Sequence, residues 1–173
     1  MDVSMFRLNL DHLPKYDLPN GYSMRRHQPG DISHWLDFHI PLFEDGVIDE
    51  ALFWHEFGQD KGILAERQYY MVHGKRVIGS ISSWFGSEER GTHLGRIHWV
   101  VLDEDYRGKG LSKPLLSFAC HRLKQLGHKQ AYLSTHTDLI PAIGLYLKFG
   151  FEPEIKSDVE KLAWDNVYQQ LDL

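Results

Sequence analysis

The chain has 173 residues, of which 42% are hydrophobic and 25% are charged, a composition typical of one globular domain with an ordinary core. Its formal net charge of −5 gives no general electrostatic attraction to nucleic acid or to an anionic membrane, so neither is expected as a partner. The sequence has no apolar run of membrane-spanning length and no signal-peptide pattern at its start. Together with a single cysteine, Cys120, which cannot form an internal disulfide, this predicts a cytoplasmic location.

The N-terminal segment is predicted to lack regular structure. Pro14 and Pro19 break any regular element in residues 1–20. We therefore expect an irregular lead-in over residues 1–20, followed by a domain over residues 21–173.

The first half of that domain predicts strands that are interrupted by two helices. Asp31 and Asp49 each stand where a helix N-cap is expected. The predicted elements are a strand over residues 21–26, helices over 31–39 and 49–57, and a β-hairpin with strands over 69–73 and 76–85.

The second half alternates strands and helices. A β-branched and aromatic run predicts a buried strand, and apolar residues with helical spacing follow it after a glycine-rich turn. The predicted elements are a strand over residues 95–102, a turn over 106–112, a helix from 112, a strand over 130–135, a helix that ends at Gly150, and a short edge strand containing Pro153.

The turn between the strand and the long helix is suited to hold a phosphate. Gly108 and Gly110 allow a tight turn, and a helix that begins there leaves backbone N–H groups unpaired at the positive end of its dipole. The spacing excludes a nucleotide P-loop and the dinucleotide fingerprint, because Lys109 is followed by Gly110 and Lys113 occupies the place of the third glycine. A plain turn with convenient glycines is the alternative.

The run Arg107-Gly108-Lys109-Gly110-Leu111-Ser112 resembles the acetyl-coenzyme A loop of the GCN5-related N-acetyltransferases (the GNAT family). A second segment, Ala142 to Pro153, is similar to the late helix and the Gly-Phe strand start of that family. The resemblance is clearest over residues 75–155. It implies an α/β (α+β) single-domain acyl-CoA N-acyltransferase fold, with a mixed, mostly antiparallel sheet flanked by helices.

The resemblance also implies where acetyl-CoA binds. In the family, the strand before the loop offers backbone N–H groups to the thioester, and the next strand splays away to admit the pantetheine arm. The implied cofactor-binding residues are Val100, Val101, Leu102, Arg107, Gly108, Lys109, Gly110, Leu111, Ser112 and Lys113.

Two residues are implied to be catalytic. Tyr146 stands where the family often has a tyrosine beside the coenzyme sulfur, and a protonated phenol can donate to the departing thiolate. His98, four residues before Leu102 and expected on the same strand face, is suited to be the general base. Packing roles for both side chains are the alternatives, and Trp99 is expected on the opposite face.

Other residues near this strand offer weaker alternatives. Arg96 could bind a substrate carboxylate or form a surface ion pair, and His136 and Glu66 are further candidates for the base. The eleven histidines do not form a recognisable ligand pattern, because His55-Glu56 lacks the second histidine of a zincin helix, so no metal is expected.

The sequence departs from the family at three positions. Glu104 replaces a frequent proline, Ser112 replaces the last Gly or Ala of the loop, and Leu139 replaces an asparagine that often contacts the coenzyme. The function that the resemblance implies is direct transfer of an acetyl group from acetyl-CoA to a primary amine in a ternary complex. A silent acyl-CoA-binding or sensor domain, and an unrelated phosphate-binding protein, remain alternatives.

The acceptor amine cannot be identified from the sequence. One aromatic cluster, expected near the acceptor, predicts either core packing or an apolar wall, and it comprises Trp35, Phe38, Phe43, Phe53, Trp54 and Phe57. Acidic residues nearby predict a solvated loop or an attraction for a cationic amine, and they are Glu44, Asp45, Asp49 and Glu50. A homodimer is a further arrangement that the resemblance leaves open.

Overall fold

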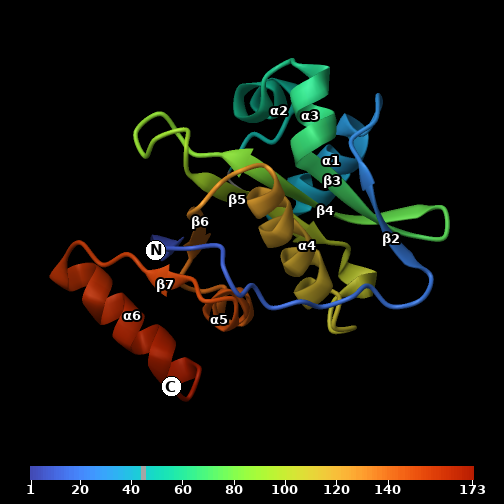
Figure 1. Ribbon diagram of the computed structural model, residues 1–173. Coiled ribbons are helices and arrows are strands. Elements are labelled where there is room, and N and C mark those ends of the chain that lie inside the picture. The colour runs from blue at the N-terminus through green and yellow to red at the C-terminus, as the bar shows by residue number, and fades with distance from the viewer. Residues whose placement is uncertain (44–45) are drawn as a thin grey trace.

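The computed structural model describes residues 1–43 and 46–173, so Glu44 and Asp45 of the predicted acidic loop lie outside it. One seven-stranded sheet has the order β2-β3-β4-β5-β6-β1-β7 (Figure 1). The strands are β1 (Asp2–Arg7), β2 (Tyr22–Arg26), β3 (Gln68–His73), β4 (Arg76–Phe85), β5 (Gly95–Leu102), β6 (Ala131–His136) and β7 (Glu152–Pro153). The helices are α1 (Ile32–His39), α2 (Glu50–Phe57), α3 (Lys61–Arg67), α4 (Ser112–Gln125), α5 (Ile140–Lys148) and α6 (Asp158–Gln170), with short 3-10 turns at Ile40–Leu42 and Glu104–Tyr106.

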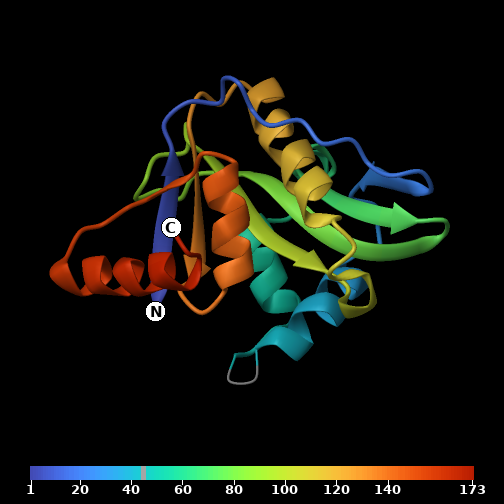
Figure 2. The same ribbon diagram turned by 90° about the horizontal axis from the view of Figure 1, so that it is seen from below.

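The sheet is mixed and mostly antiparallel, as predicted. β5 and β6 run parallel, whereas the other hydrogen-bonded neighbours run antiparallel. α4 and α5 cover one face, and α1, α2 and α3 cover the other (Figure 2). Each face has its own apolar core, and the larger core also includes α6. Within the described residues, none of the helices has both the length and the apolar composition that crossing a membrane requires.

The N-terminal segment corrects one expectation. Residues 8–20 are irregular as predicted, but Asp2–Arg7 form β1, which pairs with β6 on one side and β7 on the other. Val3 and Met5 are buried while their neighbours are more exposed, so this strand has a period-two pattern. The pattern is too short to predict a strand alone, and the pairing with β6 stabilises it.

Helices α3 and α6 were not predicted, although both carry local signals. The Asp60 side chain accepts hydrogen bonds from the first N–H groups of α3, as expected of an N-cap. At α6, the Ser157 hydroxyl accepts from Glu160 N–H, and the Glu160 carboxylate accepts from Lys156 N–H. This near capping box was readable from the sequence, and Trp164 is buried against the core.

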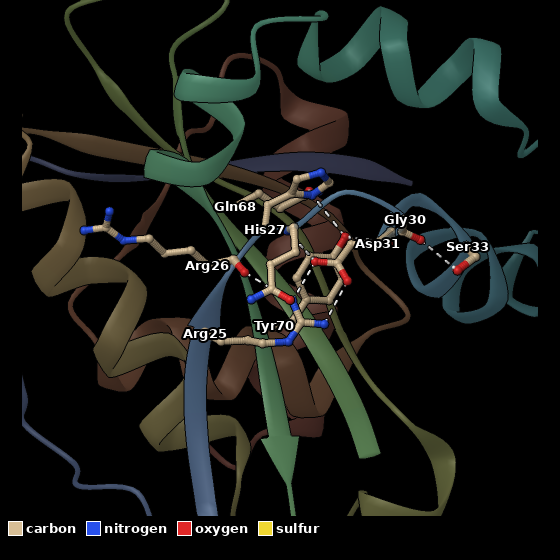
Figure 3. Close-up of polar contacts among 9 residues, drawn as sticks. Arg25, Arg26, His27, Gly30, Asp31, Ser33, Gln68 and Tyr70 are labelled. Atoms are coloured by element: carbon tan, nitrogen blue, oxygen red, sulfur yellow. Dashed lines mark hydrogen bonds and ion pairs between the residues drawn. The ribbon is translucent and has the colours of Figure 1, made fainter. Parts of the chain in front are cut away.

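Asp31 precedes α1 as predicted, but its side chain does not cap the helix. The carboxylate instead binds Arg25 through two hydrogen bonds of 2.6 and 2.8 Å and accepts from Gln28 N–H (Figure 3). Tyr70 donates its hydroxyl to the Asp31 carbonyl from β3. Asp31 therefore fixes the start of α1 against strands β2 and β3. This contact supports the smaller of the two apolar cores, to which α1 contributes.

We predict that Met5→Ala destabilises the protein by about 2–5 kcal/mol, because Met5 is fully buried in β1. Leu8→Ala is the control, since Leu8 lies just after β1 and is 66% exposed; its change is expected to stay within about 0.5 kcal/mol. Urea unfolding would measure both free energies. Equal values for the two variants would contradict the role of β1 in the core.

Candidate active site

Strands β5 and β6 separate to form an opening in the sheet. They are paired only at Gly95 with Ala131 and at Arg96 with Tyr132. Beyond this point β5 stays with β4 and β6 stays with β1, and the two strands diverge in Figure 2. The facing edges therefore leave room for an extended ligand to lie between them as an added strand. This splay agrees with the arrangement that the sequence implied.

A β-bulge interrupts β5 beside the opening. Trp99 has φ +49°, and the register between β4 and β5 shifts around Ile81, so two residues of β5 lie opposite one of β4. The added residue inverts the alternation of side chains along the strand. As a result Leu102 packs in the same core as Ile97, so His98 and Leu102 do not share a face as predicted.

The prediction that the Trp99 side chain lies on the face opposite His98 was wrong. The Glu56 carboxylate from α2 binds His98 Nε2 at 2.7 Å and accepts the Trp99 indole N–H at 3.2 Å. The bulge thus brings two consecutive side chains to one carboxylate. Glu56 was not predicted to belong to the site, because nothing in its local sequence indicates a partner 42 residues away.

The contact with Glu56 determines which nitrogen of the His98 ring carries the proton. A carboxylate only accepts hydrogen bonds, so Nε2 carries the proton and Nδ1 keeps a lone pair. Burial lowers the pKa of His98 to about 4, which outweighs the opposing effect of Glu56. The hydrogen bond from His98 lowers the pKa of Glu56 to about 2. His98 is therefore neutral near pH 7 and can accept a proton at Nδ1.

The glycine-rich turn joins β5 to the start of α4. Gly108 and Gly110 have φ of +73° and +77°, and a Cβ at either position would meet no atom within 4 Å. Across residues 1–43 and 46–173, no hydrogen bond uses the backbone N–H groups of Gly108, Lys109, Gly110 or Leu111. The first N–H groups of α4, at Ser112 and Lys113, have no partner within the helix. Unpaired N–H groups at a helix start have the geometry that anion binding requires, and anion binding at this turn stays a prediction.

The end of β5 is tied to this turn. Arg107 Nε donates to the Leu102 carbonyl at 3.1 Å, so the Arg107 side chain supports the strand end. The backbone N–H of Asp103 donates to β4. Backbone groups alternate in direction along a strand, so the N–H of Val101 also faces β4, whereas the N–H and C=O groups of Leu102 face the opening. Val100 is 36% exposed at the bulge. Of these positions, Leu102 has the backbone geometry best suited to a ligand in the opening.

Tyr146 lies on α5 with its ring buried in the larger core. In the described part of the chain, its hydroxyl makes no hydrogen bond. Burial raises the pKa of Tyr146 to about 12, and the nearby Cys120 thiol adds to the effect. The phenol therefore stays protonated and free to donate. Cys120 is a buried thiol, and burial raises its pKa to about 12.

Two weaker candidates for the base, and Arg96, the candidate for binding a substrate carboxylate, have other partners. Glu66 pairs with Arg122 at 3.8 Å, His136 pairs with Asp138 at 3.3 Å, and the Arg96 guanidinium packs over the Tyr132 ring. Within residues 1–43 and 46–173, no three His, Cys, Asp or Glu side chains are grouped to hold a metal ion. Of the departures from the family pattern, Ser112 begins α4, whereas Leu139 is 53% exposed just before α5.

Residues 32–151 match the model of the acetyltransferase (GNAT) family, which includes the bulged strand, the turn and α5. The chain belongs to the GNAT family. It is 31% identical over 160 residues to mycothiol acetyltransferase from Saccharomonospora viridis, a match that covers 85% of this chain and 51% of that protein. The chain therefore spans about half the length of this GNAT relative.

Solved structures show the same GNAT fold. A GCN5-related N-acetyltransferase from Sphaerobacter thermophilus has a TM-score of 0.66 at 17% identity, over 88% of this chain and 48% of that one. A diaminobutyrate acetyltransferase from Paenibacillus lautus, solved with L-2,4-diaminobutyric acid and coenzyme A, has a TM-score of 0.56 at 14% identity, over 74% of each chain. The predicted family and fold are thus confirmed.

The buried His98 predicts a pH dependence of stability. The pKa of His98 falls from its ordinary 6.5 to about 4 on folding, so between these pH values only the unfolded chain takes up the proton. The free energy of unfolding should therefore fall as the pH falls from 6.5 to 4. We expect His98→Gln to reduce this loss by roughly 1–3 kcal/mol.

Urea unfolding at both pH values would measure the loss. His55→Gln is the control, because His55 is an exposed neighbour of Glu56 on α2, and it should keep the full dependence. An unchanged dependence in His98→Gln would show that His98 is not a buried neutral group.

Proposed function

We propose that this GNAT chain transfers an acetyl group from acetyl-CoA to a primary amine by direct transfer in a ternary complex. The observation that carries the proposal is the anion-binding turn at Gly108 to Lys113, which lies at the end of β5 beside the opening between β5 and β6. The turn would hold the pyrophosphate, and the opening would hold the pantetheine arm. Family membership supports acetyl-CoA as the cosubstrate.

The residues around the turn supply the remaining contacts for the coenzyme. Gly108, Lys109, Gly110, Leu111, Ser112 and Lys113 would offer backbone N–H groups to the pyrophosphate. Arg107 would act indirectly, by holding the Leu102 carbonyl and thus the end of β5. The Lys109 and Lys113 ammonium groups lie over the Tyr106 and Tyr16 rings on the surface next to the turn, where they add positive charge.

In the reaction, the nitrogen of the amine attacks the thioester carbon, and a backbone N–H of β5 stabilises the oxyanion, with Leu102 best placed to donate. The C–S bond then breaks, and Tyr146 donates its proton to the departing thiolate. His98 receives the proton that the amine loses, through the lone pair on Nδ1, while Glu56 holds the ring through Nε2. The products are the amide and free coenzyme A.

A silent acyl-CoA-binding or sensor domain is the second candidate. It is favoured by the exposed Leu139, which offers no polar group where the family often has an asparagine. Both candidates bind the coenzyme, but only the enzyme turns it over. A cytoplasmic location and a homodimer remain part of the proposal, and neither is required by the chemistry.

Gly110→Glu is expected to weaken acetyl-CoA binding at least about a hundredfold, or about 2.8 kcal/mol, because a carboxylate would occupy the phosphate position. Gly127→Glu is the matched control: Gly127 also has a positive φ, +90°, and open space around it, but it lies at the far end of α4. Calorimetric titration measures both affinities. Equal binding by the two variants would refute the assignment of the turn.

Tyr146→Phe is expected to lower kcat by about a hundredfold or more, since the variant lacks the proton donor for the thiolate. Its affinity for acetyl-CoA should be almost unchanged, because the ring and its packing are kept. Tyr168→Phe on α6 is the control and should keep the parental rate. Initial rates of thiol release would measure kcat, and an unaltered value for Tyr146→Phe would remove this residue from the mechanism.

A further inference from the structure

The α1 side of the candidate site contains a buried acceptor atom that has no partner. His39, the last residue of α1, is 2% exposed, and its Nδ1 contacts the Trp35 carbonyl at 2.7 Å. A carbonyl only accepts, so Nδ1 carries the proton and Nε2 keeps its lone pair. Nε2 is buried and makes no hydrogen bond to any described residue. Such an orphaned acceptor is costly unless a ligand or a water binds it.

The His39 ring lies close to the proposed base. The centre of the Trp99 indole is 5.0 Å from the centre of the His39 ring and 5.8 Å from the centre of the His98 ring. Both imidazoles therefore pack against one indole, and each keeps one nitrogen lone pair. A primary amine that has lost its proton has two N–H bonds, so it can donate to an imidazole lone pair.

The walls around these two imidazoles are aromatic. Trp35 contacts Trp99 with ring centres 4.9 Å apart, and Phe43 contacts Trp99 at 5.7 Å. Phe57 packs against His98 at 5.6 Å. Three apolar residues after His39 remain exposed, and they are Ile40 (53%), Leu42 (46%) and Phe43 (45%). Through Phe43, this exposed patch is continuous with Trp99 and the candidate site.

Charge in the site is supplied by Glu56, whose carboxylate binds both His98 and Trp99 and is partly exposed. A cationic amine would be attracted to this carboxylate on arrival, and it would release its ammonium proton to solvent before it attacks the thioester. The rest of its body would then meet the aromatic wall and the exposed patch of Ile40, Leu42 and Phe43, whose side chains are apolar. This combination suits an ammonium group on an apolar body better than a polyhydroxylated amine.

We propose that the acceptor is a primary amine carried by an alkyl or arylalkyl body, and that His39 Nε2 accepts one of its N–H bonds. The body would lie on Phe43, Leu42 and Ile40. This inference rests on the proposed acetyl transfer and names the class of acceptor for the same site. In this proposal His39 is a substrate-binding residue, and the apolar side chains beside it select the amine.

The first experiment compares acceptors. Phenethylamine and hexylamine represent the apolar class, and glucosamine represents polyhydroxylated primary amines. We expect kcat/KM to be at least tenfold higher for the two apolar amines, at a fixed saturating concentration of acetyl-CoA. In Phe43→Ser the ratio should fall toward one, through a higher KM for the apolar amines. A preference for glucosamine in the parent protein would overturn the inference and leave acetyl transfer intact.

The second experiment tests His39. His39→Phe keeps an aromatic ring but removes the lone pair, and it should raise the KM for phenethylamine at least tenfold while the KM for acetyl-CoA stays constant. His39→Gln keeps an acceptor and should recover part of the loss; it also serves if His39→Phe does not fold. Unchanged KM values in both variants would overturn the role of His39.

Direct binding separates failure of this inference from failure of the proposed function. Phenethylamine should quench tryptophan fluorescence in the parent protein and less in Phe43→Ser, with or without turnover. If amines bind in this pattern but none is acetylated, the amine-binding preference of the site stands, whereas its role as an acceptor preference falls with the enzymatic function. If phenethylamine does not bind and no amine is acetylated, both are refuted.

Discussion

The bulge at Trp99, which adds one residue to β5, determines which side chains of this strand lie on each face of the sheet. Without the bulge at Trp99, regular alternation would direct Trp99 away from Glu56, and His98 and Leu102 would share a face. With it, His98 and Trp99 meet the acidic residue of α2, while Leu102 packs into the larger core and turns its backbone groups toward the opening. A single bulge in one strand therefore positions both the proposed acetyl-CoA site and the proposed amine site.

The bulge also marks the limit of what the sequence could predict. Local periodicity correctly indicated β5, and the spacing of Gly108 and Gly110 indicated the turn, because both signals lie within a few residues. The bulge has no such signal, since it arises from pairing with β4 around Ile81. Predictions that counted residues along β5 were therefore wrong for Trp99 and for the relation of His98 to Leu102.

Contacts between distant segments explain the remaining differences. Glu56 and His39 have no local pattern that predicts a place in the site, and Glu56 was considered only as part of an incomplete zincin helix. β1 was missed because its stability comes from β6 and β7 rather than from its own six residues. In contrast, the Ser157–Glu160 cap of α6 was readable and was overlooked.

The position of β1 has a consequence for how the chain folds during synthesis. β1 is synthesised before every other strand of the sheet, yet its partners β6 and β7 are made after β2 to β5. The nascent chain must therefore carry an unpaired, partly apolar strand while β2 to β5 are translated. The far wall of the opening beside β5, built on β6 and backed by β1, can close only after that. The proposed acetyl-CoA pocket can thus form only after β6 is made, so a product truncated before β6 would lack it even where β2 to β5 had already folded.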